Sequence, residues 1–431
     1  MAKTVEPTNK FAELIAGQSI MHIPSLTLEI GGDELKDVPV AYKTWGSLNE
    51  KADNAMVVCH ALSGSADVAD WWGPLLGAGR AFDPSRYFIV CMNALGSPYG
   101  TASPVTINPT TGKVYGPEFP LTTIKDDVRL QKMVLDRLGV KQIAVVIGGS
   151  MGGMMALEYL YFGKEYVRSA VVLASCAYHS AWGISWGEAQ RQSIYADPKY
   201  QDGYYDINDQ PSAGLSAARM SALLTYRSRN SFDSKFGRNV PNPDVHKGSD
   251  TPDISDTETS EDRWSVHNHG NVRSNRPVAY RPKPAQHYFT AQSYLRYQGQ
   301  RFIDRFDANC YIAITRKLDT HDVSRGRTAT VEEALETIEQ PVLVIGIPSD
   351  GLFTFSEQEY MHEHLKNSEL HEIQSPDGHD AFLLEFAAIN DRIHEFLVKR
   401  NPEIMKGLDH AAPIGESGCG SLISETSVTE W

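Results

Sequence analysis

Residues Ile143–Gly153, with the sequence IAVVIGGSMGG, carry the pattern that decides the fold. The run Ile143–Ile147 is apolar and rich in β-branched residues, which predicts a buried strand. Ser150 follows between two pairs of glycines, and a helical pattern begins near Met154. A strand and a helix joined by so sharp a turn need small residues around the serine, because larger side chains would collide with the neighbouring elements. A glycine-rich connection or a phosphate-binding turn is the alternative, but the strand and helix on either side favour a nucleophilic serine.

Short apolar runs of the same kind recur along the chain, with helical patterns between them. One such helical pattern is Thr123–Leu138, whose apolar residues lie three and four positions apart. Strands that alternate with helices predict an α/β protein with a mostly parallel sheet and helices on both faces. The other predicted strands are Ala55–Cys59, Tyr87–Met92, Ala170–Leu173 and Val342–Ile347.

The alternation of strands and helices stops in the middle of the chain. Residues 178–339 are rich in aromatic residues and arginine, so we expect a mainly helical cap inserted between two parts of the core, 20–177 and 340–400. Inside the cap, residues 242–284 are poor in aliphatic residues and dense in Ser, Thr, Asp and Pro, a composition that predicts disorder. Residues 401–431 form a polar C-terminal tail in this division of the chain.

Composition narrows the classes of protein that fit. The net charge of the 431 residues is -14, so the chain lacks the excess of basic residues expected of a nucleic-acid-binding protein. The five cysteines are widely spaced and include no CxxC pair, which argues against a disulfide framework and against a zinc site. The first residues hold no apolar stretch of signal-peptide length, and no run approaches the roughly 18 apolar residues of a membrane helix. We therefore expect a soluble, cytoplasmic protein without a metal.

A nucleophilic serine needs a base and an orienting acid, which in sheets of this kind follow it in the order Ser, acid, His. Asp350 stands just after the predicted strand Val342–Ile347, at the carboxyl edge of the sheet. His379 lies in a loop after the next apolar stretch, Leu370–Ile373. Taken singly, such an Asp is more often a turn or cap residue and such a His a solvated one. Order and placement together predict a triad of Ser150, Asp350 and His379.

Acyl transfer also requires two backbone N–H donors for the oxyanion of the tetrahedral intermediate. Met151, directly after the nucleophile, supplies one of them. We assign the second to Leu62 in the sequence CHALSG, because Ser63 and Gly64 allow the backbone to turn inward, although an ordinary loop is the alternative. His60 in the same stretch is interpreted as a hydrogen-bonded core residue and not as a second base.

Several motifs together resemble homoserine O-acetyltransferases, particularly those of the fungal type. The resemblance covers roughly residues 23–398. It implies an α/β-hydrolase fold in which the triad and the oxyanion donors are the residues already chosen. The motifs are GGSMGG at 148–153, CHAL at 59–62 with WWG at 71–73, NPxTG at 108–112, RFDAN at 305–309 and GHD at 378–380.

The resemblance also implies residues for the acceptor. Arg219 and Tyr226, in AARM and LTYR, resemble the pair that holds the carboxylate of homoserine, and Asp380 resembles the residue that pairs with its ammonium group. Without the resemblance, Arg219 would be read as a surface arginine and Tyr226 as a core tyrosine. The implied donor is acetyl-CoA, with no permanently bound cofactor, and such enzymes are typically homodimers. The insertion at 242–284 is a departure, since shorter bacterial relatives lack it.

Other functions remain open at this stage. An esterase or amidase needs only the triad and the oxyanion hole. Related enzymes on the same scaffold acetylate deacetylcephalosporin or acylate serine, and a succinyl donor is an alternative to an acetyl donor. The alternative from a different functional class is a catalytically inactive protein of the same fold, which binds a ligand through its cap.

Overall fold

The computed structural model describes residues 9–239, 264, 267–268, 289–408 and 410–414. The predicted disordered insertion at 242–284 lies outside the described residues, apart from Trp264, His267 and Asn268, and so does the tail from residue 415 onward. Within the described ranges, no helix is long and apolar enough to cross a membrane.

Among the described residues, one sheet of eight strands forms the centre of the molecule, in the order β1-β2-β4-β3-β5-β6-β7-β8. The pairs β1/β2 and β2/β4 are antiparallel, and every other neighbouring pair is parallel. This confirms the predicted mostly parallel sheet and adds an antiparallel edge that the sequence analysis missed. The strands are β1 (Ser19–Thr27), β2 (Glu34–Trp45), β3 (Ala55–Cys59), β4 (Phe88–Met92), β5 (Ile143–Gly149), β6 (Ala170–Leu173), β7 (Val342–Gly346) and β8 (Ser368–Glu372).

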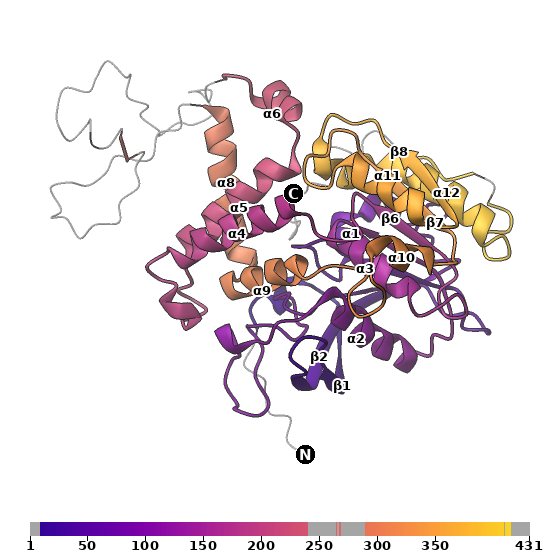
Figure 1. Cartoon of the computed structure of the whole chain (residues 1–431), viewed down its shortest axis with the longest axis horizontal. Coiled ribbons are helices and arrows are strands. Elements are labelled where there is room, and N and C mark those ends of the chain that lie inside the picture. The colour runs from indigo at the N-terminus through magenta and orange to yellow at the C-terminus, as the bar shows by residue number, and fades with distance from the viewer. Residues whose placement is uncertain (1–8, 240–263, 265–266, 269–288, 409, 415–431) are drawn as a thin grey trace.

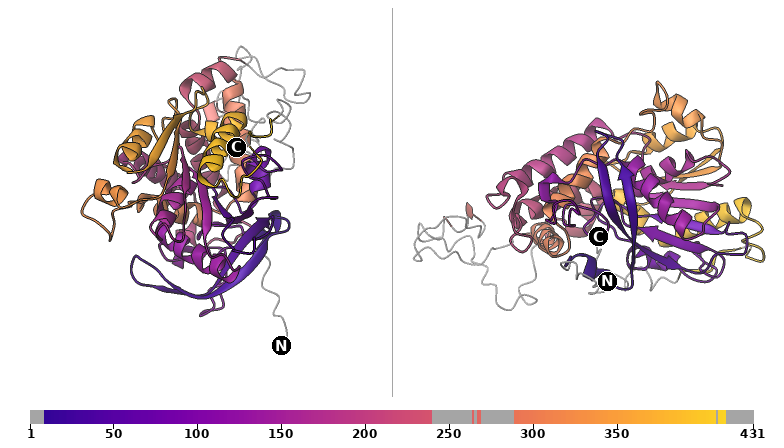
Figure 2. Two further views of the ribbon diagram at one scale, coloured as in Figure 1. Left: turned by 90° about the vertical axis from the view of Figure 1, so that its right-hand side faces the viewer. Right: turned by 90° about the horizontal axis from the view of Figure 1, so that it is seen from below.

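Helices cover the sheet on both faces, and Figure 2 shows them on either side of the strands. All seven residues of β5 are buried, which is why its sequence is an unbroken apolar run and does not alternate. The helices α1 (Val68–Trp71) and α12 (Phe386–Arg400) contribute to the apolar core on one face. The opposite face is covered by α2 (Ile124–Arg137), α3 (Met151–Leu160), α10 (Val331–Glu336) and α11 (Phe355–His364).

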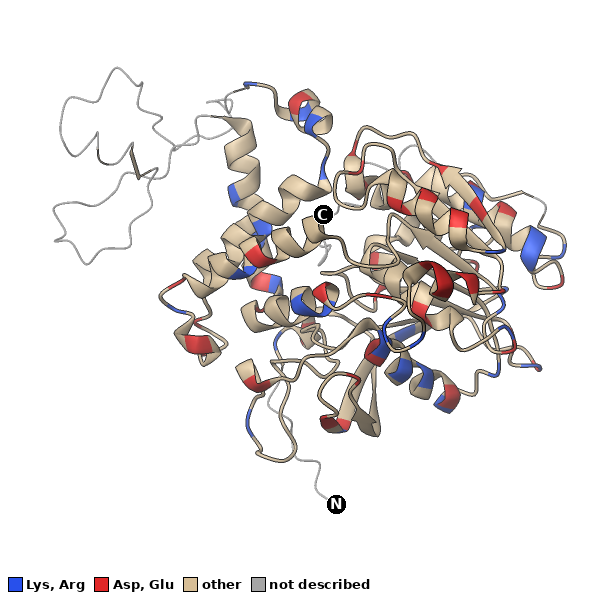
Figure 3. Ribbon diagram, in the orientation of Figure 1, with Lys and Arg blue, Asp and Glu red and all other residues tan. Residues whose placement is uncertain are grey.

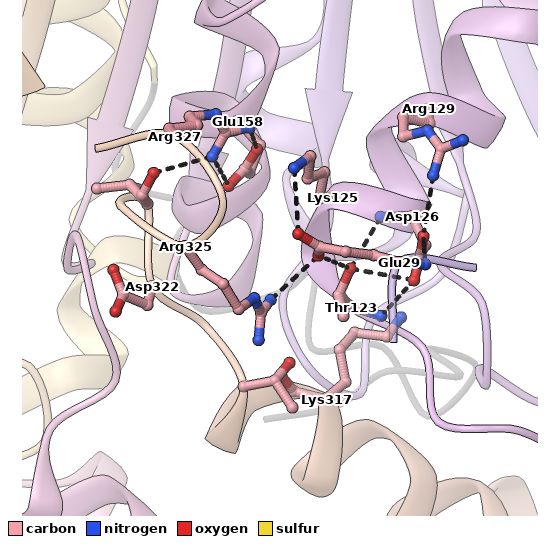
Figure 4. A network of polar contacts seen from close by, with 12 residues as sticks. Glu29, Thr123, Lys125, Asp126, Arg129, Glu158, Lys317, Asp322, Arg325 and Arg327 are labelled. Carbon is pink, nitrogen blue, oxygen red and sulfur yellow. Dashed lines mark hydrogen bonds and ion pairs between the residues drawn. The ribbon is translucent and has the colours of Figure 1, made fainter. Parts of the chain in front are cut away.

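A polar network fixes the start of α2 to two distant parts of the chain (Figure 4). Thr123 and Asp126 form a capping box, in which each side chain accepts a hydrogen bond from the other residue's backbone N–H. Glu29, in the turn after β1, accepts from Thr123 Oγ1 at 3.0 Å and from Lys125 Nζ at 3.1 Å. Arg325, on the segment that returns from the cap, also pairs with Glu29 at 3.2 Å. The network therefore joins the antiparallel edge, α2 and the returning segment.

Five described helices between β6 and β7 lie together beside one end of the sheet (Figure 1). Among them, α4 packs against α5 and α9, and α5 packs against α8. The short helix α10 falls inside the range predicted for the cap, yet it packs against α11 beside the sheet. The cap helices are α4 (Ala181–Tyr195), α5 (Ser212–Tyr226), α6 (Arg229–Phe236), α8 (Thr290–Arg305) and α9 (Ala308–Asp319).

The cap is joined to the core by a fully buried ion pair. Lys317 on α9 contacts Asp127 on α2 at 2.5 Å, and neither side chain is exposed. Its ammonium group also donates to the carbonyl oxygen of Leu95 at 2.7 Å. The ribbon in Figure 3 marks further Lys and Arg residues on α6 and α8, whereas Asp and Glu predominate on α10 and α11. The charged pair inside the structure fixes α9 above the carboxyl ends of the strands.

Candidate active site

Ser150 lies at the sharp turn between β5 and α3. Its backbone angles, φ 57° and ψ -126°, are strained for a residue with a side chain. A Cβ on Gly148 would stand 2.0 Å from the carbonyl oxygen of Gly152, and a Cβ on Gly152 would stand 2.1 Å from that of Cys59. These approaches give the physical reason for glycine on both sides of the serine. The N–H of Ser150 donates to the carbonyl oxygen of Leu173 on β6 at 3.0 Å, which holds the turn in place.

A continuous chain of hydrogen bonds joins the three residues predicted as a triad. His379 Nε2 lies 3.0 Å from Ser150 Oγ, and His379 Nδ1 lies 2.7 Å from Asp350 Oδ2. Asp350 follows β7 and His379 lies in the short helix Gly378–Leu383 after β8, as their predicted positions require. Ser150 is only 8% exposed, so the chain is largely shielded from water. This is the geometry of a nucleophile, a base and an orienting acid.

Asp350 is held so that only one of its oxygens faces the histidine. Its Oδ1 accepts hydrogen bonds from the backbone N–H groups of Leu352 at 2.8 Å and Phe353 at 3.0 Å. A carboxylate has no hydrogen to give, so Nδ1 of His379 must be the donor to Oδ2. Nε2 is then without a proton in the neutral ring and can accept the proton of Ser150.

The loop predicted to carry the second oxyanion donor is fixed by His60. This residue is fully buried, and its Nε2 accepts a hydrogen bond from the N–H of Ala94 at 3.0 Å. Its Nδ1 therefore carries the proton and donates to the carbonyl oxygen of Ala61 at 2.7 Å, directly before Leu62. Burial lowers the pKa of His60 to about 4, so the ring is neutral at physiological pH. The interpretation of His60 as a hydrogen-bonded core residue is confirmed.

A cavity opens above Ser150 between the core and the cap, with an empty volume of about 630 Å³ that includes the solvent at its mouth. Leu62, Ser150 and His379 lie on its core side. Met151 is the first residue of α3 and is buried directly after the nucleophile. The cap side contains residues that the sequence analysis did not identify, because nothing in a helix sequence shows which face meets a distant loop. They are Gly183, Trp186, Gly187 and Gln190 on α4, and Thr315, Leu318 and Asp319 on α9.

Two of the three residues expected to hold the acceptor line this cavity, and the third is buried near them. Tyr226 and Asp380 line it, and the ring of Tyr226 is 6.0 Å from that of His379. Arg219 is fully buried behind them, with its guanidinium group 5.6 Å from the Tyr226 ring and 4.8 Å from the Phe302 ring. It is absent from the described residues that line the cavity, so its role toward a carboxylate stays a prediction.

Burial and neighbouring charges act together on Asp380, which lines the cavity. Loss of solvent raises the pKa of Asp380, and the nearby charges of Arg227, His379 and Arg219 oppose that rise. The strongest partner is Arg227, whose Nε lies 2.9 Å from Asp380 Oδ2. Arg227 directly follows Tyr226 in the chain, and no motif in the sequence indicated a role for it.

Comparison with known proteins places the chain in a family. Residues 54–386 match the α/β hydrolase fold family. A homoserine O-acetyltransferase of Ascobolus immersus is 52% identical to this chain over 99% of the chain and 96% of its own length. The homoserine O-acetyltransferase of Saccharomyces cerevisiae is 54% identical over 98% of this chain and 94% of its own length. The chain belongs to the homoserine O-acetyltransferase family. The predicted family and α/β-hydrolase fold are thereby confirmed.

Solved structures share the fold of this family member. The crystal structure of esterase E22 has a TM-score of 0.73 at 23% identity, covering 88% of this chain and 99% of that one. A homoserine O-acetyltransferase from Bacillus anthracis has a TM-score of 0.71 at 22% identity, covering 92% of this chain and 98% of that one. An esterase and an acetyltransferase thus share this architecture, so the fold by itself does not distinguish water from an alcohol as the acceptor.

Proposed function

We propose that this protein transfers the acetyl group of acetyl-CoA to the side-chain hydroxyl of L-homoserine through an acetyl-Ser150 intermediate. The product, O-acetyl-L-homoserine, would serve methionine biosynthesis in the cytoplasm. The observation that carries the proposal is the hydrogen-bond chain from Ser150 through His379 to Asp350 at the floor of a cavity whose roof is the cap. Relatives named for this activity, at 52% and 54% identity over nearly the whole chain, support the choice of substrates.

In the first half-reaction, His379 Nε2 removes the proton of Ser150 as Oγ attacks the thioester carbonyl carbon. The carbonyl oxygen becomes an oxyanion, which the N–H groups of Leu62 and Met151 would stabilise. The C–S bond then breaks and the thiolate leaves with the proton from His379. Asp350 holds the ring in the required tautomer and stabilises the imidazolium that forms between the two steps.

In the second half-reaction, homoserine takes the place of the thiol. Asp380 would meet its ammonium group, and Arg219 with Tyr226 would meet its carboxylate. The side-chain hydroxyl gives its proton to His379 Nε2 while its oxygen attacks the acetyl carbon. The bond to Ser150 Oγ breaks, and Oγ recovers the proton from His379. The same base therefore serves both alcohols in turn.

Transfer has to outcompete hydrolysis of the acetyl-enzyme. Ser150, His379 and Asp380 are each less than one tenth exposed, so bulk water has limited access to the reacting atoms. A bound hydroxyl near His379 has a high effective concentration, whereas water has no such anchor. The cap helices α4, α5 and α9, which line the cavity, would supply this advantage.

The test is to incubate the protein with acetyl-CoA and homoserine and to quantify free thiol, O-acetylhomoserine and acetate. The proposal expects thiol and O-acetylhomoserine in nearly equal amounts, with thiol release accelerated by homoserine. Serine and deacetylcephalosporin, added in competition, should accept the acetyl group less efficiently. Acetate as the main product, at a rate that homoserine does not change, would instead establish a hydrolase.

A further inference from the structure

Arg227 connects the end of cap helix α5 to the loop that carries the catalytic base. Tyr226 is the last residue of α5, and the backbone of Arg227 leaves the helical conformation. The Arg227 side chain reaches Asp377 with Nη1 at 2.6 Å and Asp380 with Nε at 2.9 Å. These two carboxylates lie on either side of His379 in the sequence. One guanidinium group thus bridges both flanks of the base.

The contact between the two segments is close enough to fix their relative position. Gly378 has φ +68°, and a Cβ there would stand 2.5 Å from the backbone N of Ser228. Ser228 Oγ donates to the carbonyl oxygen of Pro376. Ser231 Oγ, one turn further along, donates to Asp377 Oδ1 at 2.5 Å. The cap and the loop therefore meet through backbone packing and hydrogen bonds as well as through the ion pair.

Asp380 is the member of this cluster that faces the cavity. Its side chain is 3% exposed and that of Arg227 is 13% exposed, so the pair is screened little by solvent. The ion pair uses Oδ2, and a carboxylate can accept hydrogen bonds through both oxygens. The other charged or titratable side chains close enough to interact with Asp380 are Arg219 and Tyr226 on α5, His379 beside it, Lys235 on α6 and Tyr294 on α8.

We propose that Arg227 is a positioning residue for the acceptor half-reaction, which holds the Asp380 carboxylate in place to receive the ammonium group of the acceptor. This inference rests on the proposed function. Arg227 acts through Asp380 and is itself absent from the described residues that line the cavity. A lysine could not replace it fully, because one ammonium group lacks the fork of donors that bridges two carboxylates.

The effect should be selective for the acceptor because the core holds His379 independently. His379 Nδ1 keeps its bond to Asp350, and the N–H of Gly378 donates to Ser349 Oγ at 3.0 Å. Neither contact involves the cap. Loss of Arg227 should therefore impair homoserine binding far more than acylation of Ser150.

The test compares Arg227→Met and Arg227→Lys with the parent protein in the two half-reactions separately. Acylation is followed by thiol release from acetyl-CoA alone, and the acceptor step by kcat and KM for homoserine between pH 6 and 9. We expect Arg227→Met to lower kcat/KM for homoserine about 100-fold, mainly through KM, and Arg227→Lys to recover part of the loss. Removing the cation should raise the pKa of Asp380. As the pH is lowered, the increase in KM for homoserine should therefore begin at a higher pH than in the parent protein.

The matched control is Arg327→Met, which breaks an ion pair with Glu158 of similar burial. Neither Arg327 nor Glu158 is among the described residues that line the cavity. It should lower stability without changing the pH dependence of KM. Equal losses in both half-reactions for Arg227→Met, or the same pH profile in Arg327→Met, would overturn the inference. The proposed function is judged separately, because it fails if the parent protein does not form acetyl-Ser150.

Discussion

Replacing Asp350 with asparagine is expected to reverse the tautomer of His379. Asp350 Oδ1 accepts from the backbone N–H groups of Leu352 and Phe353, so an asparagine must place its carbonyl oxygen there. Its NH2 group then faces His379 Nδ1, which lies 2.7 Å from Oδ2 in the parent protein. Nδ1 has to accept this bond, and the ring proton moves to Nε2. Nε2 faces Ser150 Oγ and can no longer take its proton.

The size of the effect follows from the loss of general-base catalysis. In a serine triad, an acid-to-amide change that keeps the geometry lowers kcat on the order of 10,000-fold. That factor corresponds to about 5.5 kcal/mol in the activation free energy. The free energy of unfolding should change by only about 1 kcal/mol, because both backbone hydrogen bonds to Oδ1 remain.

The assay is the single-turnover rate of thiol release from acetyl-CoA in Asp350→Asn, with Ser150→Ala as the background. Urea denaturation of each variant shows whether the fold is retained. A folded Asp350→Asn protein that releases thiol within tenfold of the parent rate would refute the tautomer argument. It would mean that Asp350 is not the partner that orients the base.

Three further predictions concern stability. Gly152→Ala places a Cβ 2.1 Å from the carbonyl oxygen of Cys59, so we expect the free energy of unfolding to fall by about 3 kcal/mol and most activity to be lost. An unchanged urea denaturation curve would contradict so close a contact. Lys317→Met leaves Asp127 buried without its cation, so the free energy of unfolding from urea denaturation should fall by roughly 3 to 5 kcal/mol. A decrease below about 1 kcal/mol would show that the pair does not hold the cap. Burial lowers the pKa of His321 to about 3, below its unfolded value, so its contribution to stability is present above about pH 6.5 and is lost as the pH falls toward 3. Between pH 6.5 and 5 the protonation of His321 in the unfolded chain should lower the free energy of unfolding of the parent protein by about 2 kcal/mol. The decrease should be correspondingly smaller in His321→Gln.

The parallel half of the sheet could be predicted closely from the sequence. The predicted strands Ala55–Cys59 and Ala170–Leu173 coincide with β3 and β6, because strands buried on both faces give unbroken apolar runs. The antiparallel strands β1 and β2 were missed for the opposite reason. Their buried residues are separated by exposed ones, and Lys36 and Asp37 interrupt any apolar run in β2.

The contacts among Ser150, His379 and Asp350 were predictable because their order along the chain and their places at strand ends reflect the topology of the sheet. The side-chain contacts of the cap were not. Arg227 and Asp380 are 153 positions apart by their numbers, and their ion pair depends on how α5 ends against a loop of the core. The contact of the buried Arg219 with the ring of Phe302 depends likewise on the packing of α5 against α8. Local sequence carries no signal for either contact.

The most direct measurement of the central claim is mass spectrometry of the protein mixed with acetyl-CoA in the absence of any acceptor. The account predicts one acetyl group per chain, located on the peptide that contains Ser150, and its removal when homoserine is added, with O-acetylhomoserine as the product. An acetyl group on another residue, or product formation by a Ser150→Ala variant at the parent rate, would contradict the account.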